Sequence, residues 1–292
     1  MNKVYQIITD NFIAKLEEGV IPWKKGWDAP GSRGCNLISK RPYSGINLFI
    51  TSMMGYSQPY WATFNQIKSS GARIKKGEKS VPIIFYKTGM KTNDKGKEEA
   101  FPILRFYNVW NYEQLEDPPV HLLPTPEENA ALDNVTGTVD ERCRPILLAY
   151  NNRPKIKPGG GRACYSPFDD LIRIPKRRYF SSLHEYWATL FHELAHSTGH
   201  SDRLKREGMT IMKSTKEYSF EELVAEMTAA FLCAEAGISN EELDDNAVAY
   251  IASWLKVLKN EPTWVIKASQ KASRAAEYIL GKFYKQQHEK AA

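Results

Sequence analysis

No stretch of this sequence stays apolar over the roughly 20 residues that a membrane-spanning helix requires. Residues 1–6 also lack the continuous apolar core of a signal peptide, so we expect a cytoplasmic protein with no membrane partner. Cysteine is scarce, and the four cysteines lie far apart without forming a C-x-x-C pair. This argues against a disulfide framework and against a cysteine-ligated zinc site, and it fits a reducing compartment.

Positive charge and aromatic residues are concentrated in the first part of the chain. Residues 1–119 contain 17 Lys and Arg against 11 Asp and Glu, which accounts for the whole net charge of +6, and they hold 17 of the 34 aromatic residues. A single-strand binder needs cations for phosphates and ring faces for bases. A basic domain whose rings fill its own core has the same composition, so composition alone leaves both interpretations open.

The sequence His192-Glu193-Leu194-Ala195-His196 has the pattern H-E-x-x-H. Residues four apart share one face of a helix, so His192 and His196 can direct imidazole nitrogens at one ion. Glu193 lies one step round the helix, where its carboxylate can take a proton from metal-bound water. Ser182 and Glu185 form a capping-box pattern that predicts a helix starting near Leu183.

A catalytic zinc site with two histidines needs a third protein ligand. A predicted helix over residues 220–236 offers two glutamates four residues apart, Glu222 and Glu226. We predict that Glu222 is the ligand and that Glu226, one turn on, orients a ligating histidine. Ser219 and Glu222 also fit a capping box, in which case Glu226 is the ligand. Zn²⁺ and Mn²⁺ both accept such donors, so the identity of the metal is open.

Candidate nucleic-acid contacts lie in loops and turns of the first part. Two tryptophans surround two lysines after a first helix predicted over residues 3–18, and a basic turn covers residues 73–79. Each tryptophan could equally fill the core, and the turn could be a solvated charge run. The residues that we assign to nucleic-acid binding are Trp23, Lys24, Lys25, Trp27, Tyr43, Asn47, Trp61, Arg73, Lys75, Lys76 and Lys79.

The predicted fold class is α+β with two domains. Prolines and acidic residues between 113 and 126 indicate a linker, which divides the chain into residues 1–118, a linker at 119–126 and residues 127–292. The first domain is predicted to contain a helix at 47–54, a second helix suggested by residues 61–67 with Thr63 as its N-cap and Gly71 as its terminator, and strands at 81–86 and 101–110. The second is predicted to be mostly helical with a small sheet, its first helix covering residues 140–150 with Pro145 limiting its start.

The second domain resembles the zincin-like metallopeptidase domain of the ArdC antirestriction family and of related polyvalent proteins from plasmids and phages. The residues that carry this resemblance are 163–167, 186–200, 201–204 and 221–226. The first domain is similar to the single-stranded-DNA-binding domain of the same family in residues 22–23, 43–47, 61–66 and 71–79. Many relatives are expected to have Trp where Ser197 stands, a departure that affects no ligand.

The resemblance implies an antirestriction protein of a mobile element that binds single-stranded DNA on entry into a host and shields it from restriction. It carries the metal ligands onto His192, His196 and, less directly, Glu222. Double-stranded DNA is a further candidate partner. The alternatives are a DNA-associated metalloprotease that cleaves an unidentified DNA-bound protein with Glu193 as general base, and a DNA-binding module with a purely structural metal. Tyr165, Tyr218 and His200 are candidates for the donor that stabilises an oxyanion.

Overall fold

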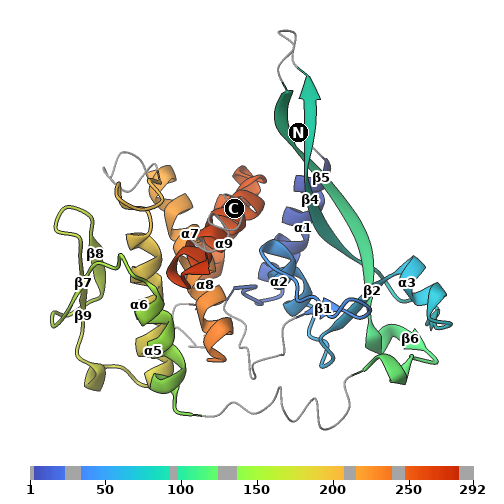
Figure 1. Cartoon of the computed structure of the whole chain (residues 1–292), viewed down its shortest axis with the longest axis horizontal. Helices are drawn as coiled ribbons and strands as arrows, with labels where there is room; N and C mark the ends of the chain where they lie inside the picture. Colours follow the sequence, from blue (N-terminus) through green and yellow to red (C-terminus); the bar gives the residue numbers. More distant parts are fainter. Residues whose placement is uncertain are drawn as a thin grey trace, which may run out of the picture.

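The computed structural model describes residues 3–23, 34–92, 98–123, 137–206, 215–238 and 247–282. For residues 86–92, 98–104, 215–217 and 247–248 it describes the backbone alone. Helices and small sheets are combined in both halves of the chain (Figure 1). Within these ranges, no helix has both the length and the apolar character needed to cross a lipid bilayer.

Helices and a mixed sheet form the N-terminal half. Helix α1 (Lys3–Glu17) buries the apolar positions at four-residue steps that predict it, and α2 (Ile46–Ser52) and α3 (Phe64–Ser69) follow. Thr63 and Gln66 form a reciprocal capping box at the start of α3. The four-stranded sheet has the order β1 (Cys35–Asn36), β2 (Tyr60–Thr63), β5 (Glu98–Asn111) and β4 (Val81–Thr92), and a two-stranded sheet joins β3 (Arg73–Ile74) to β6 (Leu115–Glu116).

The β4–β5 hairpin is the longest feature of this half and extends beyond the rest of the sheet (Figure 1). Its strands pair from Val81 with Val109 to Thr92 with Glu98, so the two predicted strands are both longer than expected. Residues 93–97, between the two strands, lie outside the described residues. Short 3₁₀ turns at Tyr112–Gln114 and Val120–Leu122 follow β5.

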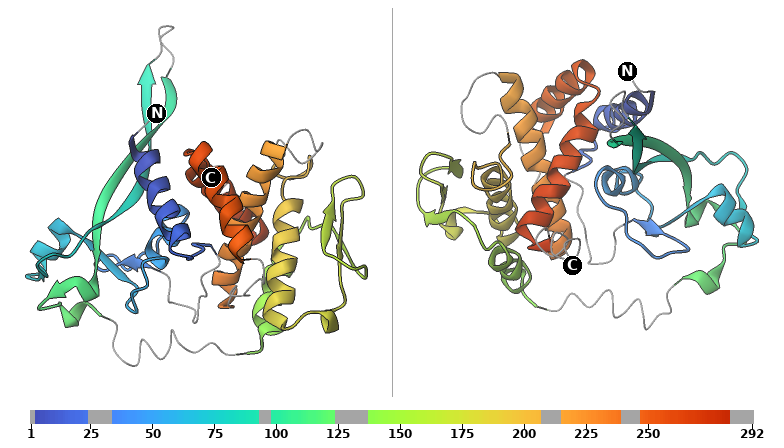
Figure 2. Two further views of the ribbon diagram at one scale, coloured as in Figure 1. Left: turned by 180° about the vertical axis from the view of Figure 1, so that it is seen from behind. Right: turned by 45° about the horizontal axis from the view of Figure 1, so that its top comes forward.

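The C-terminal half places helices beside a three-stranded sheet. Helix α5 (Val139–Ala149) is followed by a sheet of order β7 (Lys155–Pro158), β9 (Leu171–Ile174) and β8 (Cys164–Ser166). A 3₁₀ turn (Arg177–Tyr179) leads to α6 (Leu183–Ser197), and α7 (Thr215–Ala236), α8 (Ala247–Asn260) and α9 (Trp264–Ile279) come next. Both views in Figure 2 show α7 between α6 and α9, and it contacts both.

The structure agrees with some of the predicted helix boundaries and differs at Pro145 and Ser219. Thr63 caps α3 as predicted, and residues 61 and 62, which precede the cap, lie in β2 because strand pairing continues up to Thr63. Helix α5 covers nearly the predicted residues 140–150, but Pro145 lies inside it and does not limit its start, which is set by a capping box at Thr138 and Glu141. Helix α7 begins at residue 215, so Ser219 is an interior position and does not cap it.

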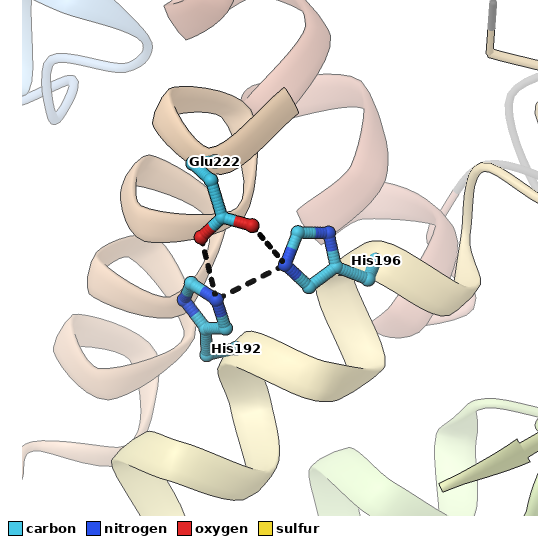
Figure 3. Close-up of side chains that lie close together, drawn as sticks. All are labelled: His192, His196 and Glu222. Atoms are coloured by element: carbon cyan, nitrogen blue, oxygen red, sulfur yellow. Dashed lines mark hydrogen bonds and ion pairs between the residues drawn. The ribbon is translucent and has the colours of Figure 1, made fainter. Parts of the chain in front are cut away.

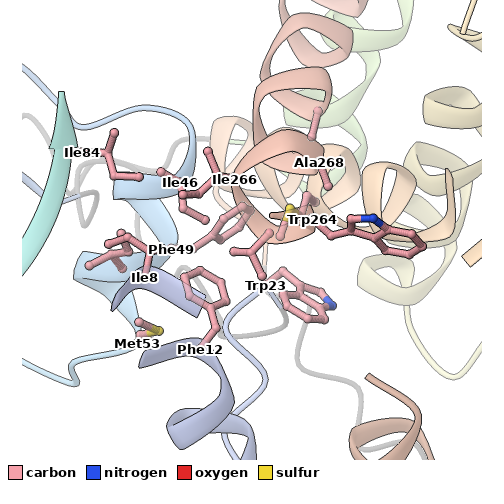
Figure 4. Packing of buried hydrophobic residues seen from close by; sticks show 14 of the residues in the cluster. Ile8, Phe12, Trp23, Ile46, Phe49, Met53, Ile84, Trp264, Ile266 and Ala268 are labelled. Carbon is pink, nitrogen blue, oxygen red and sulfur yellow. The ribbon is translucent and has the colours of Figure 1, made fainter. Parts of the chain in front are cut away.

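One hydrophobic core joins the two halves across the predicted linker. The cluster in Figure 4 combines Phe12, Phe49 and Ile84 with Trp264 and Ile266. Phe49 of α2 stacks on Phe231 of α7 with ring centroids 4.7 Å apart. Helices α7 to α9 therefore complete the core of the N-terminal half, and the two halves are not packed independently. Of the predicted linker, residues 119–123 are described and 124–126 lie outside the described residues.

Replacing Leu258 with Ala tests this shared core. Leu258 is fully buried on α8, which packs against α1, so its truncation should lower the free energy of unfolding by about 2–5 kcal/mol. Hydrogen exchange should then accelerate in α1 as well as in α8. Ser253→Ala at an exposed position of α8 is the control and should cost less than about 0.5 kcal/mol. Unchanged protection of α1 in Leu258→Ala would show that the halves are independent.

Candidate metal centre and nucleic-acid surface

Helix α6 holds the two motif histidines in a fixed position. The hydroxyl of Ser182 accepts a hydrogen bond from the backbone N–H of Glu185 at 3.0 Å and caps the helix start. The carboxylate of Glu185 reaches back to Ser181, one residue before the predicted partner. The apolar side of α6 is buried in the C-terminal core through Tyr186, Trp187, Leu190, Phe191 and Leu194. With that side fixed, His192 and His196 project towards α7 (Figure 3).

The structure brings His192, His196 and Glu222 together as the sequence predicts (Figure 3). The two Nε2 atoms are 3.1 Å apart, and the Glu222 carboxylate lies 3.5 Å from His192 Nε2 and 3.4 Å from His196 Nε2. One donor atom from each residue lies within 4.8 Å of the other two. Two imidazole nitrogens and a carboxylate oxygen at this spacing suit a divalent ion with one position left open.

A buried ion pair supports His196 from behind. The Glu221 carboxylate lies 3.5 Å from His196 Nδ1 and accepts hydrogen bonds from Arg206 Nε at 2.9 Å and Nη2 at 2.5 Å. Arg206 also donates to the carbonyl of Ala195 and the hydroxyl of Thr198, so it fastens the chain after α6 to the end of that helix. The orienting role that we predicted for Glu226 therefore falls to Glu221.

The carboxylates of Glu221 and Glu222 stabilise positive charge at His192 and His196. Burial alone would lower the pKa of His196, but Glu221 and Glu222 outweigh burial and raise it to about 10. Burial raises the pKa of Glu222, whereas hydrogen bonds from His192 and His196 lower it by more, so its pKa lies well below the usual range. The site is thus built to hold a cation, and a bound divalent ion would take the place of the imidazole proton.

Glu226 lies one turn beyond Glu222 on α7. Burial raises the pKa of Tyr250, and the negative charge of Glu226 raises it further, which places Glu226 next to Tyr250 and away from the histidines. This arrangement favours Glu222 over Glu226 as the third ligand. The reason is geometric: Glu222 lies within reach of both histidines, whereas Glu226 lies one helical turn further along α7 and interacts with Tyr250 of α8.

Glu193 and Tyr218 are the groups beside the cluster that could act on a substrate. Glu193 is 8% exposed, on the same helix as both histidines. Partial burial and the negative charge of Glu222 raise the pKa of Tyr218, and Glu193 adds to this effect, so both carboxylates lie near the phenol. Tyr165 instead donates its hydroxyl hydrogen to Asp170, and His200 accepts from the backbone of Asp202. Tyr218 is therefore the best placed of the three candidate oxyanion donors.

The rings of Trp23 and Trp61 are buried, which corrects their assignment as base-stacking residues. Trp23 is completely buried, packs edge-on against Trp254 and donates its indole N–H to the hydroxyl of Tyr250. Trp61, in β2, is also buried, and its ring packs edge-on against Tyr56. Neither ring face is available to a nucleotide, because both complete the hydrophobic core.

The side chains of Asn47 and Tyr43 also make contacts within the fold. The side-chain amide of Asn47 donates to the carbonyl of Ile84 at 2.6 Å and accepts from the N–H of Ile84 at 2.7 Å, so it satisfies the free edge of β4. Tyr43 is half-buried against the core, and burial raises the pKa of its hydroxyl to about 12. Both side chains thus have a role in the fold, and their assignment to nucleic-acid binding stays a prediction.

The predicted basic turn is on the surface. Arg73, Lys75, Lys76 and Lys79 are all exposed, although Lys75 also donates to the carbonyl of Glu113 at 2.7 Å. Arg73 lies 3.6 Å from Asp117 in an exposed ion pair, which contributes little stability. Lys24, Lys25 and Trp27 lie outside the described residues, so their role stays a prediction.

Exposed rings are present elsewhere in the N-terminal half. Phe85 is 51% exposed and Tyr107 is 44% exposed, and their rings meet edge to face at 6.0 Å on the β4–β5 hairpin. Phe64 at the start of α3 and Phe106 on β5 are exposed as well. The strand pattern located Phe85, Phe106 and Tyr107 in strands, but which ring faces solvent depends on what covers each face of the hairpin.

Residues 2–110 match the N-terminal domain of anti-restriction factor ArdC, and residues 147–271 match a zincin-like metallopeptidase. The crystal structure of the metal-free antirestriction protein ArdC from plasmid R388 has a TM-score of 0.73 and 30% identity to this chain. The match covers 97% of this chain and 98% of that one. The chain belongs to the ArdC antirestriction family. The predicted two-domain α+β architecture is confirmed with it.

Another solved structure and three related proteins are also similar to this chain. A Mn(II)-bound structure of the R388 ArdC protein has a TM-score of 0.72 and 31% identity, and the match covers 95% of this chain and 97% of that one. Two Escherichia coli proteins named DNA primase TraC are 31% and 29% identical over 98% and 94% of this chain. The chain spans only 20% and 27% of their lengths. The protein y4eC of Sinorhizobium fredii is 27% identical over 94% of this chain and 91% of its own length.

Metal titrations of three Glu→Gln variants test the centre. Glu222→Gln should abolish tight binding of Mn²⁺ or Zn²⁺, because it removes a donor of the cluster. Glu221→Gln should weaken binding about 10–100-fold, since it loosens the support of a ligating histidine. Glu226→Gln is the matched control on the same helix and should bind metal as the unaltered protein does. Calorimetry at constant pH measures all three, and loss of binding in Glu226→Gln alone would refute the assignment.

Proposed function

We propose that this protein is an antirestriction-type single-stranded-DNA-binding protein with a metal-dependent, peptidase-like domain, and that it protects mobile-element DNA on entry into a host. The observation that carries the proposal is the match to the R388 ArdC protein over nearly the full length of both chains. Two features of this chain support it independently: exposed rings and cations in the N-terminal half, and a complete donor set for a divalent ion in the C-terminal half.

The nucleic-acid function rests on surface chemistry that differs from the sequence-based assignment. Phe85 and Tyr107 present ring area on the hairpin, and Phe64 presents a ring on α3, which leads directly to the basic turn at residues 73–79. Bases stack on such rings without regard to sequence, while lysines and arginines neutralise phosphates. Double-stranded DNA hides its base faces, so a surface of this kind favours single strands.

Substituting the hairpin rings tests this part of the proposal. Phe85→Ala with Tyr107→Ala should weaken binding of a labelled oligothymidylate, because each lost stacking contact costs about 1–3 kcal/mol. Fluorescence anisotropy over a salt series measures the effect. Ile38→Ala, another exposed apolar position in this half, is the control and should bind normally. Equal affinity of the ring variant and the control would remove the hairpin from the interface, and a response flat in salt would contradict phosphate binding.

A second candidate function, metal-dependent proteolysis, is favoured by the position of Glu193. When bound, a divalent ion held by His192, His196 and Glu222 would supply a Lewis acid and an acidic water. Glu193 would then accept the proton of that water, its low exposure keeping it poorly solvated. Tyr218 would donate a hydrogen bond to the oxygen of the attacked carbonyl, since its phenol lies beside the cluster.

Glu193→Gln separates proteolysis from a structural role of the metal. This variant should bind Mn²⁺ or Zn²⁺ and oligothymidylate normally, but it should cleave denatured casein about 10²–10⁴-fold more slowly than the unaltered protein. Metal titration and a gel-based cleavage assay measure the two properties on one preparation. Cleavage that persists with metal bound would overturn the role of Glu193. Absence of cleavage by the metal-loaded, unaltered protein would assign the metal a structural role.

A further inference from the structure

The β7–β9–β8 sheet of the C-terminal half carries a concentration of positive charge. Residues 153–178 contain eight Lys and Arg and only two acidic residues, a net charge of +6 that equals that of the whole chain. All eight of these cations are exposed, but Arg177 is paired with Asp140, which leaves seven without a carboxylate partner among the described residues. We call these seven the basic sheet surface, and they are Arg153, Lys155, Lys157, Arg162, Arg173, Lys176 and Arg178.

Strand register places the central cations on the outer face of the sheet. Lys157 pairs with Arg173 across the parallel β7–β9 ladder, and paired residues share one face of a sheet. Lys155 lies two residues before Lys157 and projects to the same side. Ile172 and Ile174, which alternate with Arg173, are fully buried against the core behind the sheet. Lys155, Lys157 and Arg173 therefore point together into solvent.

The acidic residues nearby do not neutralise this surface. In the part of the chain that the structure describes, none of the seven cations forms an ion pair with a carboxylate. Asp170 is committed to the buried Arg203, which donates to both of its carboxylate oxygens at 2.8 and 2.7 Å. Asp169 accepts from the hydroxyl of Ser166. The eighth cation, Arg177, is by contrast paired with Asp140 at 2.5 Å and contacts the rings of Tyr186 and Trp187.

A groove and exposed rings accompany the charge. The groove has a volume of about 790 Å³ and runs between α5 and β7, which is an edge strand of the sheet. Leu147, Ile156 and Leu171 supply its apolar part, and Arg153, Lys155 and Lys157 supply its cations. Phe168, in the turn between β8 and β9, is 99% exposed, and Tyr179 is also exposed beside Arg178.

We propose that the basic sheet surface binds the phosphate backbone of a single-stranded nucleic acid, as a second contact region of the strand bound by the N-terminal half. The inference rests on the proposed function. Cations two residues apart on a strand are about 6.6 Å apart, a spacing that can follow successive phosphates of an extended chain. Bases can stack on the exposed rings at the border of the surface, whereas the carboxylates of an acidic peptide would not contact those rings favourably.

This surface would bring a nucleic acid close to the metal centre. Strands β8 and β9 pack directly against α6, the helix that carries His192 and His196. The N-terminal half lies on the other side of the helices (Figure 1), so the second region lengthens the stretch of strand in contact with the protein. A protein carried on the same strand would thereby be held beside the metal.

The test replaces three cations of the full chain with glutamine: Lys155→Gln, Lys157→Gln and Arg173→Gln. Binding of a long labelled oligothymidylate is measured across a salt series. The slope of log affinity against log salt should become less steep by about 2, since each single-strand phosphate contact contributes about 0.7. The control is a matched triple variant on α8 and α9, Lys256→Gln, Lys267→Gln and Lys271→Gln, which should leave the slope unchanged.

Circular dichroism and metal titration first establish that both triple variants fold and bind metal alike. A sheet variant whose slope and affinity equal those of the control overturns the inference. The proposed function would still stand in that case if Phe85→Ala with Tyr107→Ala weakens binding of oligothymidylate. A sheet variant that loses binding of labelled polyglutamate but keeps oligothymidylate binding assigns the surface to an acidic peptide and also overturns it. An unaltered protein that binds no oligothymidylate overturns both proposals.

Discussion

The packing of α7 against its neighbours is the constraint on which the rest of this structure depends. This helix is apolar on several sides, as expected for a helix buried within a protein. Leu223, Val224 and Met227 contribute to the core shared with the N-terminal half, and Leu232 and Cys233 contribute to the core behind α6. The same helix supplies the carboxylates of the metal centre, so the position of the site and the joining of the two halves are set by one element.

Within the centre, charge balance explains why so many polar groups are buried. Glu221 is buried where an isolated carboxylate would be costly, and Arg206 and His196 compensate it. Glu222 faces both histidines without an arginine partner of its own among the described residues. The excess of negative charge is thus directed at the two imidazoles, where a divalent cation is best accommodated.

The net charge of a long segment can hide a local concentration of charge, as the second part of this chain shows. The second part of the chain is neutral as a whole, and for that reason its composition indicates no nucleic-acid contact. Folding separates that charge: acidic residues pair around Arg177, Arg203 and Arg206, and an unpaired basic face remains on the β7–β9–β8 sheet. In the N-terminal half, conversely, Trp23 and Trp61, which the sequence indicates as base-stacking residues, are buried in the core.

Local signals in the sequence determined α1, the caps at Thr63 and Ser182, the H-E-x-x-H pairing on α6 and the α+β, two-domain family architecture, because each depends on residues a few positions apart. Glu222 was separable from Glu226, and Glu221 recognisable as the support of His196, only once α7 was packed against α6. Tertiary structure likewise decided that Trp23 and Trp61 are buried and that Phe85 and Tyr107 are exposed. The physical reason is that exposure and long-range pairing depend on which faces meet, and residues distant in sequence supply the covering face.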